Sequence, residues 1–158
     1  LPIPPSPNLP NMKAVYLYPA TCYFEATPVS LGRGTSLPFQ VYGHPNMTGY
    51  DYSFTPKSVP GAKNPPQLNK LCHGVNLSNM SDEEIWKRGV DLSYVIDAYK
   101  NLNIGDHFFR PFFELLVGTD YVRKMIIEGK SAEEIKNRWK GDVEKFKEQR
   151  KPYLLYQE

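Results

Sequence analysis

Residues 18–45 read YPATCYFEATPVSLGRGTSLPFQVYGHP, and the predicted organisation of the chain follows from them. Apolar runs at residues 14–18 and 37–42 are typical of buried strands. The segment between them holds two glycines and more polar groups than a structural connection needs. We therefore expect a loop between two strands that carries the chemistry of the protein. Its polar and glycine residues are Glu25, Thr27, Ser30, Gly32, Arg33, Gly34 and Thr35.

Arg33 is the best-presented cation of this loop. Gly32 and Gly34 flank it, so the backbone can take positive φ and come close to a ligand or to another segment of the chain. A guanidinium presented in this way can bind a carboxylate or phosphate through two parallel hydrogen bonds. The alternative is an internal ion pair between Arg33 and Glu25 that only fixes the loop. The motif is not a P-loop, because the glycine spacing and the following Lys are missing.

Glu25 is the catalytic candidate. A carboxylate that follows an apolar strand can be partly desolvated and act as a general acid or base. Its alternative role is the same ion pair with Arg33. A nucleophilic serine is poorly supported, because Ser30 lacks the nucleophile-elbow pattern and has no base beside it in the sequence.

Composition indicates one globular domain of 158 residues, with 41% hydrophobic and 23% charged residues. The net charge of +2 comes from scattered Lys and Arg, which does not indicate a nucleic-acid partner. No apolar run approaches the length of a membrane span. His44, His73 and His107 lack metal-ligand spacing, so we predict neither a metal nor another cofactor. Cys22 and Cys72 fall in strand-like runs and could form a disulfide or remain free thiols.

The first half of the chain is rich in proline, which favours short strands and ordered loops. Residues 1–12 are predicted to be an extended, Pro-rich linker from an upstream domain, and residues 13–158 the domain itself. The chain begins with Leu instead of Met, so we expect it to be a piece of a longer protein. Residues 46–69 should form a long surface excursion around a short strand at 52–55.

The next strand is expected at residues 70–77, where Gly74 indicates a bulge or a close backbone approach. The pattern then becomes helical. Capping-box spacings at Ser81 and Glu84, and again at Ser131 and Glu134, predict two helix starts. An apolar stripe predicts a helix over residues 92–102 that stops at Gly105, and a Phe-rich core segment follows at 108–113. Two further helices are predicted, one from residue 119 or 120 to 128 and a last one that ends at about residue 150. Ile135, Trp139, Val143 and Phe146 line one face of that last helix, and residues 153–156 form an apolar tail expected to close the domain.

Strands first and helices afterwards indicate an α+β domain, in which helices from the C-terminal half pack on a short mixed β-sheet from the N-terminal half.

Several short runs also match a known family in their order along the chain. They are PSPNLP at 5–10, Tyr18-Pro19 with Thr21, residues 25–35 followed by Pro38-Phe39, KLCHGV at 70–75, LLVGTD at 115–120, Trp139, and Arg150 with YLLY at 153–156. They resemble the C-terminal half of the NamZ-type exo-β-N-acetylmuramidases, a family formerly of unknown function. The most specific part is the pattern Glu-X-Thr-X-X-Ser-X-Gly-Arg-Gly-Thr. The chain departs from the family at Ala26 and Pro28, where Gly and Asn are usual, and at residues 44–46.

This resemblance implies a peptidoglycan glycoside hydrolase that removes terminal N-acetylmuramic acid, in the periplasm or outside the cell. Its active cleft would lie between an upstream Rossmann-like half, which holds the family's catalytic Glu, and the present half. The partners implied are that upstream domain and muramic glycan fragments. The cleft residues carried over are Glu25 as a catalytic group, and Tyr18, Thr27, Ser30, Arg33 and Thr35 for substrate binding or support. A non-catalytic carbohydrate- or partner-binding module with the same fold is the alternative.

Overall fold

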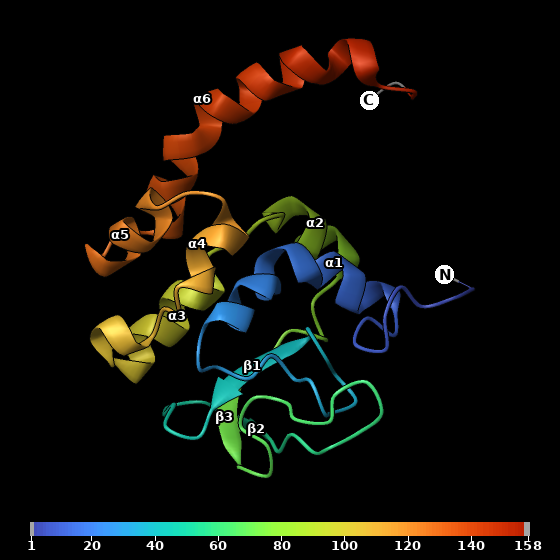
Figure 1. The fold of residues 1–158 in the computed structure, drawn as a ribbon, viewed down its shortest axis with the longest axis vertical. Coiled ribbons are helices and arrows are strands. Elements are labelled where there is room, and N and C mark those ends of the chain that lie inside the picture. Colours follow the sequence, from blue (N-terminus) through green and yellow to red (C-terminus); the bar gives the residue numbers. More distant parts are fainter. Residues whose placement is uncertain (1, 157–158) are drawn as a thin grey trace.

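The computed structural model describes residues 2–156 and has a small sheet beside a larger assembly of helices (Figure 1). The helices are α1 (Met12–Thr21), α2 (Asp82–Arg88), α3 (Ser93–Leu102), α4 (Phe112–Val117), α5 (Tyr121–Ile127) and α6 (Ala132–Arg150). The strands are β1 (Val41–His44), β2 (Tyr52–Phe54) and β3 (Cys72–Asn76). Short 3₁₀ turns are η1 (Cys22–Ala26), η2 (Gly105–His107) and η3 (Lys151–Tyr153). The predicted α+β class is confirmed, but the sheet is antiparallel in the order β1-β3-β2 and not mixed.

The strand predicted at residues 14–18 is wrong, because this run lies in helix α1. The side chain of Asn11 caps the helix and accepts a hydrogen bond of 2.9 Å from the backbone N–H of Ala14. The buried residues follow helical spacing: Ala14, Leu17, Ala20 and Thr21. Pro19 lies inside the helix on its exposed side. The Asn11 cap and the buried face of α1 therefore favour a helix more strongly than the apolar run favours a strand, and they outweigh Pro19, which disfavours a helix.

The sheet begins later than predicted but contains the expected close approach. Residues 37–40 form a turn closed by a hydrogen bond from Gln40 N–H to the Leu37 carbonyl, so β1 starts at Val41. The strands expected near 52–55 and 70–77 are confirmed as β2 and β3. Gly74 pairs with Gly43, and a Cβ on Gly74 would lie 1.9 Å from the carbonyl oxygen of Tyr42. Only glycine fits between these strands.

Aromatic packing and one half-buried carboxylate join the sheet to the helices. The ring of Phe24 in η1 stacks on Tyr42 in β1, with centroids 4.9 Å apart. Asp97 in α3 accepts hydrogen bonds from the hydroxyls of Tyr42 at 2.8 Å and Tyr50 at 2.7 Å. Burial and this carboxylate raise the pKa of both tyrosines, so both remain protonated donors. η1, β1 and α3 are therefore fixed relative to one another.

The helical half follows the prediction with two corrections. α3 ends at Leu102 and is capped by Asn103, which has a left-handed φ of +46°, so the predicted stop at Gly105 is two residues late. The Phe-rich segment includes helix α4. Phe108 and Phe113 are buried as expected, whereas Phe112 is exposed.

Both predicted helix caps are present, one of them only in part. At α6, the Ser131 side chain accepts from the Glu134 N–H, and the Glu134 carboxylate accepts from the Ser131 N–H. At α2, Ser81 accepts from the Glu84 N–H, but the Glu84 carboxylate pairs with Arg88 instead. The Ser81–Glu84 spacing therefore gives a single N-cap hydrogen bond and not a complete capping box.

The predicted apolar face of α6 packs only over its first half. Ile135 is buried and Trp139 is partly buried against the core, but Val143 and Phe146 are exposed. Figure 1 shows the second half of α6 extending away from the other helices. The tail expected to close the domain, residues 153–156, is exposed as well.

The Pro-rich segment folds back in a turn and is not a simple extended spacer. Ser6 and Leu9 form an isolated β-bridge, and the Asn8 side chain donates to the Gly61 carbonyl at 3.1 Å. Leu9 packs against the core. Leu1, Gln157 and Glu158, which the predicted domain boundaries include, lie outside the described residues.

Gly74→Ala should lower the free energy of unfolding by about 1–3 kcal/mol, because the added methyl group forces β1 and β3 apart. Urea denaturation measures this change. Gly141→Ala is the matched control, since no atom lies within 4 Å of the added Cβ on this helical glycine, and it should leave stability unchanged or raise it by up to about 1 kcal/mol. Equal losses in the two variants would contradict the close strand contact.

Candidate functional site

The two charged residues of the predicted loop form an ion pair. Nη2 of Arg33 donates to Oε1 of Glu25, which lies in η1 directly after helix α1. The side chains are 36% and 21% exposed, respectively. No donor among residues 2–156 reaches the second carboxylate oxygen, Oε2. The pair thus joins the end of the first helical segment to the glycine turn, while part of both groups still faces solvent.

The two glycines are required by the chain itself. Gly32 and Gly34 both have φ of +81°. A Cβ would lie 2.5 Å from the Leu37 carbonyl oxygen at Gly32 and 2.3 Å from the Lys57 carbonyl oxygen at Gly34. The sequence predicted that the glycines allow a close approach either to a ligand or to another segment of the chain, and here they approach other segments. These close contacts hold the Arg33 backbone between the segments that contain Leu37 and Lys57.

The guanidinium of Arg33 lies over the aromatic ring of Phe39. The Arg33 Cζ lies 5.3 Å from the Phe39 ring centroid, and the ring of Tyr18 packs on the same Phe39 at 5.0 Å. Phe39 is buried and has φ of +60°, which costs of order 1–2 kcal/mol for a non-glycine residue. Its N–H donates to the Leu31 carbonyl at 2.8 Å. The sequence reasoning did not select Phe39, although it lies in the Pro38-Phe39 pair that follows the motif.

The three hydroxyl residues of the motif bind the loop backbone. Thr27 donates to the Phe24 carbonyl at 2.9 Å, and Thr35 donates to the Gly32 carbonyl at 2.7 Å. Ser30 pairs through its backbone with Gly43 of β1, at 2.8 and 2.9 Å. Thr27 and Ser30 are buried and Thr35 is partly exposed. Their observed contacts are those of loop supports.

Two distant segments also hold the loop. The Arg110 N–H donates to the Ala26 carbonyl, and the Gln67 side chain donates to the Pro28 carbonyl, both at 2.9 Å. Gln67 is a second residue with a strained φ of +60°. Neither contact could be predicted from a local sequence pattern. Gln67 is about 40 positions from Pro28, and Arg110 is about 80 positions from Ala26. Arg110 also places an exposed cation on the segment next to Ala26.

The remaining titratable groups beside Glu25 are held neutral. Burial, and then the Glu25 carboxylate, raises the pKa of Tyr18, while Arg33 opposes the increase. Burial and the same carboxylate raise the pKa of Cys22 to about 11. Cys22 is therefore a thiol at neutral pH and not a nucleophile. The negative charge of this cluster resides on Glu25 and the positive charge on Arg33.

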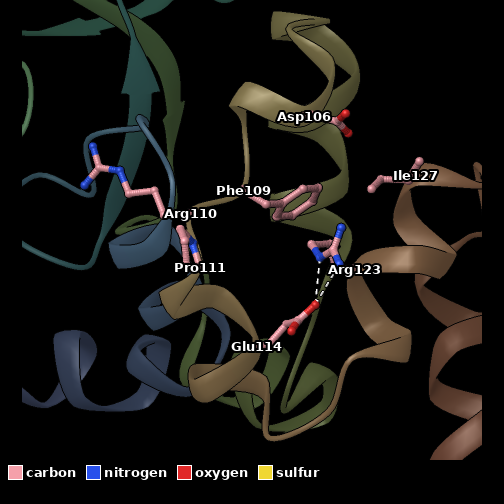
Figure 2. A pocket seen from close by; sticks show the side chains of 7 residues that line it. All are labelled: Asp106, Phe109, Arg110, Pro111, Glu114, Arg123 and Ile127. Carbon is pink, nitrogen blue, oxygen red and sulfur yellow. Dashed lines mark hydrogen bonds and ion pairs between the residues drawn. The ribbon is translucent and has the colours of Figure 1, made fainter.

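A hollow of about 390 Å³ lies between α4, α5 and the segment before α4 (Figure 2). Within it, Glu114 accepts from Nε and Nη2 of Arg123, both at 2.8 Å. Figure 2 shows the Arg110 side chain pointing away from that pair. Glu114 and Arg123 pair with each other, and the hollow contains none of the site residues predicted from the sequence, so the Glu25–Arg33 loop remains the candidate site.

Cys22 and Cys72 are free thiols, and Cys22 lies in η1 instead of a strand. Among residues 2–156, no three His, Cys, Asp or Glu side chains are placed to hold a metal ion. Within the same residues, each helix is too short or too polar to span a membrane.

Comparison with known proteins identifies the family. The family model described as "Exo-beta-N-acetylmuramidase NamZ, C-terminal" matches residues 16–156. The chain belongs to this family. A curated relative, the peptidoglycan beta-N-acetylmuramidase NamZ of Bacillus subtilis (strain 168), is 34% identical over 96% of this chain and 40% of its own length. The chain thus spans less than half of that relative, and the resemblance inferred from the motifs is confirmed.

Two solved structures share the fold. A crystal structure of a DUF1343 family protein from Bacteroides fragilis NCTC 9343 is 83% identical, with a TM-score of 0.99 over 100% of this chain and 45% of its own. A second DUF1343 family protein from the same strain has 20% identity and a TM-score of 0.69, over 98% of this chain and 45% of its own. The second likeness supports the fold alone.

The Cys22 environment gives a direct test of the cluster. Glu25→Gln removes the carboxylate that raises the thiol pKa, so the pKa should fall and alkylation at pH 8 should become faster. The rate is measured with iodoacetamide over a pH series in a Cys72→Ser background. Glu128→Gln, at the exposed end of α5, is the control. An unchanged Cys22 titration in Glu25→Gln would show that the carboxylate does not face the thiol.

Proposed function

We propose that this chain is the C-terminal half of a peptidoglycan glycoside hydrolase that releases terminal N-acetylmuramic acid. The observation that carries the proposal is the Glu25–Arg33 pair resting on Phe39, within the motif most typical of the family. The chain would form one wall of a cleft whose other wall is an upstream, Rossmann-like half. We call the two halves together the longer protein. Its substrate places it outside the cytoplasmic membrane, in the periplasm or the extracellular space.

Arg33 is proposed to recognise the group that defines the substrate. N-acetylmuramic acid differs from N-acetylglucosamine by a lactyl ether that carries a carboxylate, so a selective enzyme needs a cation at that position. Arg33 gives one Nη2 bond to Glu25, and its Nη1 has no acceptor among residues 2–156. Its Nε is buried and also lacks an acceptor among them. The guanidinium can therefore bridge Glu25 and a substrate carboxylate.

Glu25 is proposed to act on the substrate through its free oxygen. Tyr18, beside it and protonated at neutral pH, can donate a hydrogen bond to a sugar oxygen. Thr27, Ser30 and Thr35 keep the loop in shape through the bonds described above, and Thr35 is open enough to touch substrate. Tyr18, Glu25 and Arg33 are then the residues in contact with the glycan.

The chain alone is expected to fold without hydrolysing substrate. Glycosidases use two carboxyl groups about 5–10 Å apart on either side of the scissile bond, and Glu25 supplies one. The second is proposed to come from the upstream half. The measurement is turnover of a chromogenic β-glycoside of N-acetylmuramic acid by purified chain and by the longer protein. Robust turnover by the chain alone would contradict this division.

A non-catalytic carbohydrate-binding module is the second candidate. It is favoured by the ion pair itself, because Arg33 already has an internal partner that could serve only to fix the loop. The two candidates differ in what Glu25 does. In a binding module Glu25→Gln leaves no reaction to lose, whereas in the hydrolase it removes turnover.

In the longer protein, Arg33→Ala should lower kcat/KM for the muramic glycoside far more than for the matching glucosaminide. Truncating one partner of a partly desolvated charge pair costs about 2–5 kcal/mol, which is roughly 30-fold to several-thousand-fold in rate. Glu25→Gln should lower kcat/KM for both substrates. Both variants are compared with the unaltered protein on the two glycosides, with folding checked by circular dichroism.

The Arg110→Ala variant tests which of the two cations near the loop, Arg33 or Arg110, binds the substrate carboxylate. A selective loss of muramic activity in Arg110→Ala, with equal losses on both substrates in Arg33→Ala, would assign the carboxylate to Arg110 and leave Arg33 as a loop-fixing residue. Unchanged turnover in Glu25→Gln would remove Glu25 from catalysis.

A further inference from the structure

The second half of α6 and the described residues after it form an arm whose side chains are almost all exposed to solvent. We define the arm as residues 140–156. Every residue from 140 to 149 is exposed, which is unusual for a helix with an apolar stripe. Figure 1 shows the arm leaving the domain on the side of the helices opposite the sheet. The arm continues directly from the first half of α6, where Ile135 is buried in the core.

The arm carries large apolar side chains on one face. Val143 and Phe146 continue the stripe that begins with Ile135 and Trp139, and they are 42% and 59% exposed. Beyond the helix, the exposed apolar residues are Tyr153, Leu154, Leu155 and Tyr156. A shallow trough of about 280 Å³ lies beside this stripe and includes Trp139 and Val143. Contiguous exposed apolar surface of this kind is typical of an interface.

Two ion pairs lie on the charged face of the arm. Lys147 bonds to Glu144 at 2.9 Å, and Lys151 bonds to Glu148 at 2.7 Å. Each of these pairs lies within one turn of the chain. Lys140, Asp142 and Lys145 are exposed to solvent, so water satisfies the charged face, whereas the exposed side chains of Val143 and Phe146 are apolar.

The 83% identical solved structure is that of a longer chain. Its match extends over the whole of this chain with a TM-score of 0.99, so the arm has the same direction there. More than half of that protein's chain lies outside the matched part. Most of the stability of a helix in a protein comes from packing of its apolar face, so we expect the exposed stripe of the arm to pack against the remaining chain of such a longer molecule.

We propose that the arm is a docking surface for the part of the longer protein that lies outside residues 1–158, with Val143 and Phe146 as its apolar anchors. A second copy of the chain fits less well, because a stable dimer buries about 800 Å² from each partner. A covalently linked segment needs less area, since it is present at a high effective concentration. This docking does not depend on Glu25 or Arg33, so its test is separate from that of the enzyme activity.

The test compares Phe146→Asp with Lys145→Asp, which introduces the same side chain one residue away and off the stripe. In the longer protein, we expect amide hydrogens of residues 140–150 to be protected from exchange. Phe146→Asp should reduce that protection at least tenfold and lower the melting temperature, whereas Lys145→Asp should do neither. Phe146→Ala, a milder change, should give a smaller loss of protection in the same direction.

Three outcomes would overturn the proposal. Residues 140–150 of the unaltered longer protein could exchange as fast as an unprotected helix. The Phe146→Asp and Lys145→Asp variants could behave alike. Light scattering could show that the longer protein is a dimer that Phe146→Asp converts to a monomer, which would make a second copy the occupant.

Discussion

The ion pair between Arg33 and Glu25 is the interaction on which the candidate site depends. It connects the 3₁₀ turn after α1 to the glycine turn before β1, and the segment between these two turns is bound to β1 by the backbone pair of Ser30 with Gly43. Exposed ion pairs contribute about 0.2–1 kcal/mol, while breaking a buried pair costs about 3–5 kcal/mol. With side chains between one fifth and two fifths exposed, this pair lies between those limits. Its value is positional, because it sets where the only free guanidinium edge of the loop points.

Backbone strain accompanies this arrangement. Phe39 and Gln67 both take left-handed φ without being glycine or asparagine, and both contact the loop or its charged pair. Strain of this kind persists where the surroundings over-determine a conformation, and it is common at binding sites. Here the Leu31 carbonyl, the Tyr18 ring and the Arg33 guanidinium fix Phe39. These contacts pre-organise the loop, which suits the proposed recognition of a small carboxylate.

The sequence predicted the class of fold and the residues of the loop, but not the helix that positions them. Residues 14–18 are an apolar run too short to distinguish a strand from a buried helix, and the Asn11 cap decided for the helix. The capping residues Ser81 and Ser131 were predictable because their signal is local. Gln67 and Arg110 were not, because each acts through a contact far along the chain. Phe39 was not, because no sequence pattern shows that the Arg33 guanidinium lies over its ring. The apolar stripe of α6 was predicted, but the exposure of Val143 and Phe146 was not. A sequence pattern shows that a helix face is apolar and does not show what covers that face.

A double-mutant cycle on Glu25 and Arg33 tests the central claim most directly. Glu25→Gln, Arg33→Met and the double variant are unfolded in urea, and the coupling energy is calculated from the four free energies of unfolding. Met keeps part of the side chain over Phe39 while it removes the charge. A favourable coupling of about 1–3 kcal/mol is the result the structure predicts. A coupling near zero would contradict it, because the two side chains would then contribute independently and the loop would not depend on their pairing.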